Sequence, residues 1–183
     1  MQKTLKRLIQ SAEQLDLELD PQRAGSAEEL RRNALQLQQV TQTFINEICK
    51  SVEKVPPTFR RLCHTIVSAV TARFPDAKFT AVGAFIFLRF FCPAIVAPEA
   101  EGLVTQVPSK EMRRGLLLIA KVVQNLANNV LFGTKELYMA PLNDFLAQNI
   151  YRVTAFLRDI SVRWHFSAQA HLLTHDTVTI SRR

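Results

Sequence analysis

Apolar residues recur at intervals of three and four along most of the chain, the spacing that lines one face of an α-helix. Almost no stretch alternates apolar and polar residues with the period of a β-strand. The pattern therefore predicts an all-α fold. Helices are expected over residues 2–15, 27–55, 57–74, 81–91 and 109–131, followed by a pair that Gly133 and Pro141 delimit and that reaches Ile160.

Several of the expected helix ends carry sequence signals. Ser26-Ala27-Glu28-Glu29 fits a capping box, in which the serine and the second glutamate each accept a hydrogen bond from the other's backbone amide. Pro57 is tolerated in the first turn of a helix, and Ser109 can cap another. The periodicity decays after Val162. We therefore expect one domain over residues 1–162 and a partly disordered tail over residues 163–183.

The most apolar stretch runs from Ala81 to Phe91. It is apolar on every side of a helix, so we expect it to be buried all round, and it is shorter than the roughly 20 residues that span a bilayer. Arg89 is its only charge, and because an unpaired buried guanidinium is costly, Arg89 must be paired or must reach out to bind something. Pro93 disfavours helical geometry at the residue before it, so the helix should end at Cys92.

The expected helix over residues 109–131 has two different faces. At 100° per residue, its polar residues gather opposite an apolar stripe that should face the core. Leu117 and Leu118 lie among these polar residues, and such a mixed face is typical of a contact surface for another protein. The alternative is that both leucines tuck under a neighbouring helix. The stripe comprises Met112, Leu116, Ile119, Val123, Leu126 and Val130, and the polar residues are Arg114, Lys121, Asn125 and Asn128.

Two blocks of sequence resemble the Ras GTPase-activating protein (RasGAP) family. The first is Phe87-Leu88-Arg89 followed by Pro93-Ala94-Ile95 and Pro98, and the second runs from Lys121 to Asn143. Both blocks stand in the family's order and at its spacing. The resemblance covers about residues 2–160, and the chain is similar above all to fungal members. It implies the C-terminal part of an all-α RasGAP domain. Within the second block the matching residues are Lys121 to Asn128, Phe132-Gly133, Lys135-Glu136, Tyr138-Met139 and Asn143.

The resemblance implies a partner, the GTP-bound form of a Ras-type small GTPase. In the family an arginine is inserted into the GTPase active site and stabilises the transition state of GTP hydrolysis, so the activator is not itself a hydrolase. The position of Arg89 braces the loop that carries this arginine, although on composition alone Arg89 could equally be a structural arginine. Lys135 and Glu136 could equally be solvated surface residues. The residues implied in GTPase binding are Leu88, Arg114, Leu118, Lys121, Gln124, Asn125, Asn128, Lys135 and Glu136.

One departure from the family pattern matters for activity. The family's catalytic arginine lies N-terminal to everything matched here, so we expect this chain to lack the arginine-finger loop, to have no catalytic residue, and to be inactive alone. Helix faces that the finger-bearing part would cover should then be exposed, with weak stability or self-association as the result. A rival hypothesis is a module that binds a small GTPase, or serves as a scaffold, without accelerating hydrolysis.

Composition and charge narrow the remaining classes. The 183 residues carry a formal net charge of +7, which suits an acidic partner, but the basic residues are scattered and not interleaved with aromatic ones, which argues against nucleic acid. Three cysteines in apolar contexts favour a reducing, cytoplasmic location, with contact to the inner face of the plasma membrane only through Ras. Direct membrane-surface binding is a rival that rests on net charge alone.

No cofactor or metal is expected, since GTP and magnesium would belong to the partner GTPase. A metal site built from tail histidines is the weaker reading, because no cysteine or carboxylate joins them at ligand spacing. His64 follows Cys63 directly, so the two side chains point to different sides of a helix, and a hydrogen-bonded core histidine is the better interpretation. The tail histidines are His165, His171 and His175.

Overall fold

The computed structural model describes residues 1–10, 16–23 and 25–162, and every regular element in these ranges is helical. The predicted all-α fold is therefore confirmed. The elements are α1 (Gln2–Gln10), α2 (Ala27–Lys50), η2 (Val52–Lys54), α3 (Pro57–Thr71), η3 (Pro75–Ala77), α4 (Lys78–Ile86), η4 (Phe87–Phe91), α5 (Cys92–Val96), α6 (Lys110–Asn128), η5 (Thr134–Leu142) and α7 (Asn143–Ser161).

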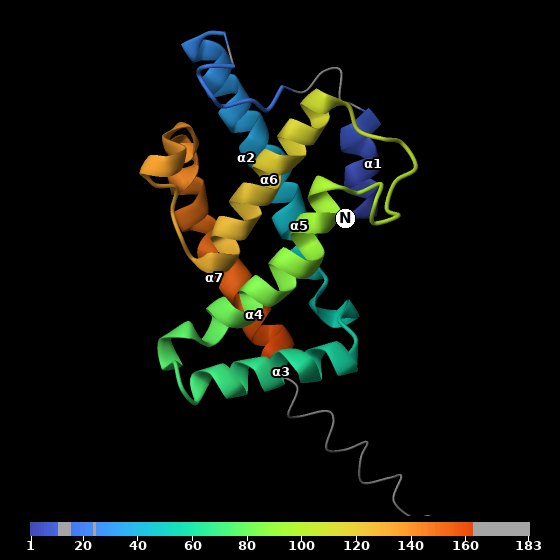
Figure 1. Cartoon of the computed structure of the whole chain (residues 1–183), viewed down its shortest axis with the longest axis vertical. Coiled ribbons are helices and arrows are strands. Elements are labelled where there is room, and N and C mark those ends of the chain that lie inside the picture. The colour runs from blue at the N-terminus through green and yellow to red at the C-terminus, as the bar shows by residue number, and fades with distance from the viewer. Residues whose placement is uncertain (11–15, 24, 163–183) are drawn as a thin grey trace, which may run out of the picture.

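Helix α6 lies at the centre of the arrangement. It packs against α2, α4, α5 and α7, while α3 crosses one end of the molecule and contacts α4 and α7 (Figure 1). The predicted core stripe of α6 is buried from Met112 to Leu126. Val130 is the exception, with 52% of its surface exposed, because Asn129 adopts a left-handed conformation (φ 56°) that ends the helix before it.

The segment from Lys78 to Val96 is one continuous helical run, and the prediction that it ends at Cys92 is wrong. η4 is a π-helical turn, in which the amide of Cys92 donates to the carbonyl of Phe87, five residues back. A proline in a regular α-helix clashes with the carbonyl four residues earlier. The wider turn directly before Pro93 relieves that conflict, so the chain continues as α5 and leaves helical geometry at Ala97.

The same turn explains why this segment is not buried all round. Phe87 is 1% exposed, whereas Leu88 and Phe90 are 43% and 48% exposed, and Arg89 also faces solvent. The extra residue of the π-turn rotates Leu88, Arg89 and Phe90 away from the core. The expectation of a fully buried helix is thus wrong for these three residues.

The apolar run is also longer than Ala81 to Phe91. Of the described helices, the run Pro75–Val96, with 22 residues and a mean hydropathy of 2.0, is long and apolar enough to cross a bilayer. The core helix of a globular domain meets the same criteria. Because α4 packs against α3, α6 and α7 and buries Val82 and Ile86 among them, its apolar character is accounted for by the protein core.

Most predicted helix ends are found near their expected positions. The capping box is present, with Ser26 accepting from the amide of Glu29 and the Glu29 side chain accepting from the amide of Ser26. α3 begins at Pro57 as expected but ends at Thr71, earlier than predicted. The predicted extension of the first helix over residues 11–15, and the predicted tail over residues 163–183 with its three histidines, lie outside the described residues.

Candidate functional site

The two predicted sequence blocks adjoin in the structure, because η4 packs against α6. On α6, Arg114 and Lys121 are half-buried and Leu117 is 37% exposed, so this side of the helix faces outward as predicted. Leu118 differs, since none of its surface is exposed. Leu118 is therefore a core residue, and its predicted contact with a partner is not supported.

Arg114 is held by an acidic residue far away in the sequence. Its Nε and Nη2 atoms donate to the two carboxylate oxygens of Glu18, at 2.9 Å and 3.0 Å. Burial opposes the ionisation of Glu18, but bonds from Arg114 and from the amides of Asp20 and Leu19 outweigh it, so the pKa of Glu18 lies below its ordinary value. Arg114 is thus paired within the chain.

Lys121, about two turns further along α6, is paired in the same way. Its ammonium group forms an ion pair with Glu136 and lies 3.4 Å from the Tyr138 hydroxyl. The guanidinium of Arg114 lies over the ring of the same tyrosine, 5.9 Å from its centre. Burial disfavours the charged form of Lys121, but the bonds to Glu136 and Tyr138 prevail and raise its pKa. Tyr138 therefore joins both cations of α6 to η5.

The matched residues Phe132 and Asn143 have a structural role that positions η5. The Asn143 side chain accepts from the amide of Phe132 at 2.9 Å and donates to the carbonyl of Phe132 at 3.1 Å. These two bonds close the loop between α6 and α7 and hold Lys135 and Glu136 beside α6. Lys135 is exposed, while Glu136 is half-buried against Lys121.

The three predicted amide side chains lie further along α6. Gln124, Asn125 and Asn128 are all half-buried. No hydrogen bond of their side chains to any other described residue is found, so their donors and acceptors are available to a partner. We call the outward residues Arg114, Leu117, Lys121, Gln124, Asn125, Asn128, Lys135, Glu136 and Tyr138 the α6–η5 face.

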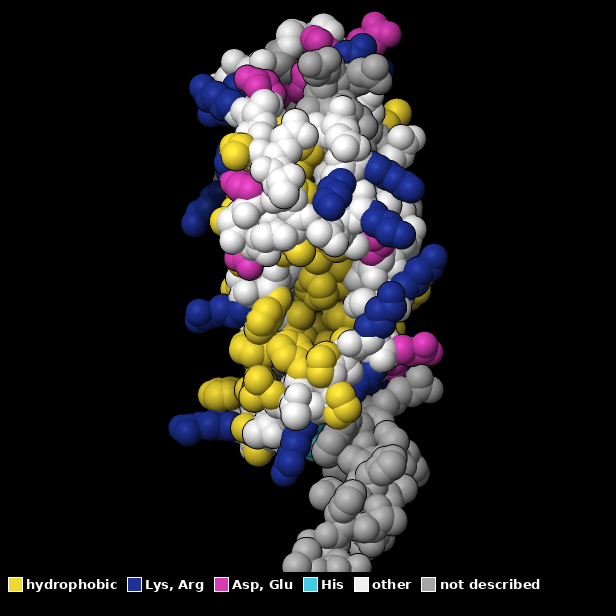
Figure 2. Space-filling view, turned by 90° about the vertical axis from the view of Figure 1, so that its right-hand side faces the viewer, with side chains coloured by type: hydrophobic (Ala, Val, Ile, Leu, Met, Phe, Trp, Pro, Cys, Tyr) yellow, Lys and Arg dark blue, Asp and Glu magenta, His cyan; other side chains and the backbone are white. Residues whose placement is uncertain are grey.

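Leu88 and Arg89 lie on a different surface, which is rich in aromatic residues. The ring of Phe90 meets the ring of Phe59 at 5.2 Å and that of Phe85 at 5.7 Å, both edge to face. Within the described ranges, the Arg89 side chain makes no ion pair or hydrogen bond. Figure 2 shows hydrophobic side chains gathered on one side of the molecule with Lys and Arg at the edges. We call Phe59, Phe85, Leu88, Arg89 and Phe90 the aromatic face.

Sequence reasoning missed Glu18 and did not assign Tyr138 a partner. Glu18 stands 96 residues from Arg114, and no local periodicity connects the two. The available signal was that an arginine beside leucines on a helix needs an acidic partner. The sequence contains many acidic residues and does not indicate which of them that partner is.

Other chemistry is not favoured within the described ranges. No group of three or more His, Cys, Asp or Glu side chains that could hold a metal ion occurs among residues 1–10, 16–23 and 25–162. Burial raises the pKa values of Cys63 and Cys92 to about 11, so both are inert thiols. His64 bonds through Nδ1 to the carbonyl of Ser161 at 2.9 Å, so the predicted hydrogen bond is present, but the side chain is half-buried and not part of the core.

Comparison with known families decides the classification. The family model described as GTPase-activator protein for Ras-like GTPase (RasGAP) matches residues 25–128, which include both η4 and the polar side of α6. The chain belongs to the RasGAP family. The match covers the helices that carry most of the two faces.

Individual relatives agree with this assignment. "Probable Ras GTPase-activating-like protein ngap" of Dictyostelium discoideum is 37% identical over 148 residues, 79% of this chain and 17% of the relative. "Ras GTPase-activating protein 1" of Homo sapiens is 34% identical over 146 residues, 78% of this chain and 14% of the relative. "Inhibitory regulator protein IRA2" of Saccharomyces cerevisiae is 29% identical over 161 residues, 87% of this chain and 5% of the relative.

The chain therefore spans less than a fifth of the length of these relatives. The identities do not single out a fungal relationship, because the Dictyostelium and human proteins match at least as well as the yeast protein.

Proposed function

We propose that this chain binds the GTP-bound form of a Ras-type GTPase and forms the docking part of a GTPase-activating unit that negatively regulates Ras signalling. The observation that carries the proposal is the family match over residues 25–128. The match includes α6 and η4, which contact each other and carry most of two outward surfaces, the α6–η5 face and the aromatic face with Leu88 and Arg89. Exposed leucines beside half-buried amides and cations have the mixed character of a protein-contact surface.

The reaction takes place in the partner. The GTPase holds GTP and magnesium and positions the attacking water, while an arginine supplied in trans neutralises charge that develops on the transferring phosphate. Such an arginine is worth about 10³–10⁵ in rate. The chain then contributes binding and orientation, needs no cofactor of its own, and is not itself a hydrolase.

We further propose that the catalytic arginine is not among residues 1–183, and that the chain corresponds to the C-terminal part of a RasGAP domain. Arg114 is committed to Glu18, and Arg60 donates to the backbone carbonyls of Val55 at 3.2 Å and Asp159 at 3.1 Å. Arg89 is exposed, and its side chain has no hydrogen-bond or ion-pair partner among the described residues, as expected of a residue that braces a separate arginine-bearing loop. The exposed side chains of Leu88 and Phe90 beside Arg89 support a surface that receives another segment.

The proposal includes a cytoplasmic location, in which the chain reaches the membrane only through the GTPase. It also keeps the predicted similarity to fungal members. The second candidate function is a GTPase-binding or scaffold module that never accelerates hydrolysis. The internal pairing of Arg114 and Lys121 favours this alternative, because both cations can serve the fold without any catalytic role.

The test is a titration of this chain with a Ras-type GTPase loaded with a non-hydrolysable GTP analogue or with GDP. Tighter binding of the GTP-analogue form is expected, together with weaker binding by Lys135→Glu. Equal affinity for both nucleotide forms, or no binding in a sample that melts cooperatively, would contradict the proposal.

A further inference from the structure

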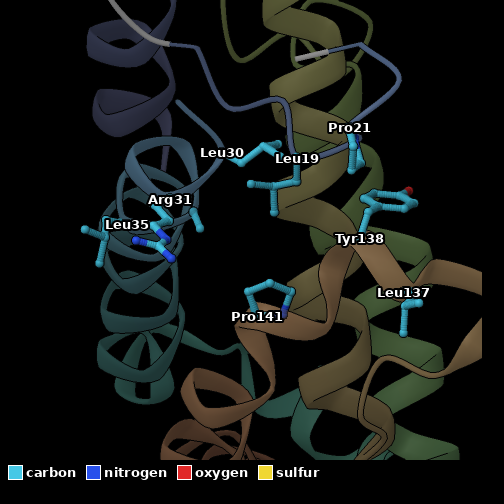
Figure 3. A pocket seen from close by; sticks show the side chains of 9 residues that line it. Leu19, Pro21, Leu30, Arg31, Leu35, Leu137, Tyr138 and Pro141 are labelled. Atoms are coloured by element: carbon cyan, nitrogen blue, oxygen red, sulfur yellow. The ribbon is translucent and has the colours of Figure 1, made fainter. Parts of the chain in front are cut away.

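A groove of about 450 Å³ lies between the beginning of α2 and η5. Its size falls within the range of about 300–1,000 Å³ that is usual for binding pockets. Figure 3 shows Leu35 and Arg31 of α2 on one side and Leu137 and Tyr138 of η5 on the other, with Pro141 at one end. These side chains present carbon atoms to the groove, and the two polar groups among them are the Arg31 guanidinium and the Tyr138 hydroxyl.

Two leucines on opposite sides of the groove face solvent. Leu35 is 60% exposed and Leu137 is 69% exposed. The exposure of Leu137 follows from the backbone, because Glu136 has non-helical angles (φ −135°, ψ 49°) that interrupt η5, whereas Met139 returns to the core with 0% exposure. Apolar surface gathered in a groove marks an interaction site.

The charge at the groove has one sign. Arg31 lines the groove, and within the described ranges it has no ion pair, whereas its neighbour Arg32 lies 3.7 Å from a carboxylate oxygen of Glu29. An exposed guanidinium beside a groove of carbon atoms favours an occupant with an apolar side chain next to a carboxylate.

The groove is continuous with the α6–η5 face. Leu137 directly follows Lys135 and Glu136, and Tyr138 lines the groove while its hydroxyl lies 3.4 Å from Lys121 Nζ. A protein bound over Lys121 and Lys135 therefore also lies next to Leu137, which is two residues after Lys135 in the chain.

We propose that this groove is a second anchor point for the GTPase, which inserts an apolar side chain between Leu35 and Leu137 and places a carboxylate against Arg31. The inference rests on the proposed function and names the part of the contact that lies beyond the two matched sequence blocks. A second copy of this chain is a poorer occupant, because a two-fold contact through the groove would bring two Arg31 side chains together.

The experiment measures the affinity of a GTP-analogue-loaded Ras-type GTPase for the full chain and for the variants Leu35→Ser, Leu137→Ser and Arg31→Glu. Tyr151→Ser is the matched control, because Tyr151 is 68% exposed, lies on α7 and does not line the groove. We expect about tenfold weaker binding for each groove variant and unchanged binding for the control. The loss with Arg31→Glu should shrink as salt is added. Equal melting temperatures of all variants would show that the fold is retained.

Each other outcome overturns the inference in a recognisable way. Wild-type affinity in all three groove variants, with nucleotide-dependent binding intact, refutes the groove and leaves the proposed function standing. Absence of GTPase binding by the unmodified chain refutes both. Self-association that Leu137→Ser abolishes, without a change in GTPase affinity, assigns the groove to a second copy.

Discussion

The α6–η5 face and the aromatic face both point outward, but they differ in how their charges are satisfied. Arg114 and Lys121 on the first face are each held by a glutamate of the same chain, and Tyr138 lies against both. Arg89 on the second face has no such partner within the described ranges, and the ring of Phe90 next to it is 48% exposed. The two cations of the first surface are therefore neutralised within the chain. The second has apolar and charged groups that only another segment or protein can cover.

The two faces depend on one close contact between the helices that carry them. A Cβ atom added at Gly83 of α4 would lie 2.9 Å from the carbonyl oxygen of Ala127 in α6 and 3.1 Å from Leu157 Cδ1. Gly83→Ala is expected to lower the free energy of unfolding by about 2 kcal/mol, since an overpacking cost of about 3 kcal/mol outweighs the gain of about 1 kcal/mol in helix propensity. Urea denaturation measures the change.

Gly115→Ala is the matched comparison for that change. The nearest atom to the added Cβ is Leu17 Cδ1 at 3.0 Å, the end of a side chain that can move. Its effect should stay within about 1 kcal/mol, because propensity and strain then nearly cancel. A larger loss for Gly115→Ala than for Gly83→Ala would show that α4 and α6 are not packed as described.

Removing one arginine from each face tests the contrast directly. Arg114→Ala is expected to lower the free energy of unfolding by about 2 kcal/mol, because it removes two charge-assisted hydrogen bonds and leaves the half-buried carboxylate of Glu18 without its cation. Arg89→Ala should change it by less than about 0.5 kcal/mol. Thermal or urea denaturation of both variants provides the measurement, and equal losses would erase the distinction between the faces.

The pH dependence of stability should reveal the pair between Glu18 and Arg114. Since the folded pKa of Glu18 lies below its ordinary value of 4.5, the pair stabilises the fold above that pH and is lost as the pH falls through the folded pKa. Glu18→Gln should therefore lower stability at neutral pH and flatten the loss of stability in acid. Glu53→Gln, at an exposed position outside any ion pair of the described residues, should keep the wild-type profile.

The last prediction concerns self-association through the aromatic face. Phe90 packs edge to face on Phe59 and Phe85 but is 48% exposed, so Phe90→Ser should lower the free energy of unfolding by about 1 kcal/mol and should reduce concentration-dependent self-association. Sedimentation velocity at several protein concentrations measures this, with Tyr151→Ser on α7 as the control. A wild-type chain that is a monomer at every concentration would contradict the prediction that the aromatic face mediates self-association.

The helices and much of the core were predictable, because the periodicity of apolar residues directly reports which side of each helix is buried. Met112, Leu116 and Ile119 confirm this on α6. The path through Pro93 was not predictable, since a proline ends most helices and only the π-turn before it lets this one continue. Leu117 and Leu118 show the same limit. They are neighbours in the sequence, yet Leu117 is exposed and Leu118 is buried, and the difference depends on packing.

The candidate site was predictable from resemblance to a family, but its electrostatics were not. Arg114 and Lys121 were expected to be available to a partner, and both are paired inside the chain by Glu18 and Glu136. Which glutamate reaches which cation depends on how the segment around Glu18 crosses α6, and that is a property of the tertiary fold. The helical run around Arg89 was expected to be buried, with Arg89 either paired or reaching out to bind something, and the π-turn exposes Arg89 to solvent.

The central claim is that the chain docks a GTPase without supplying the arginine that accelerates hydrolysis. The most direct measurement is single-turnover GTP hydrolysis by a Ras-type GTPase with this chain in excess, at concentrations where binding of the GTP-analogue form is complete. The account predicts an unchanged rate. Acceleration of a hundredfold, about 2.7 kcal/mol off the barrier, would contradict it, because an arginine within residues 1–183 would then act as the finger.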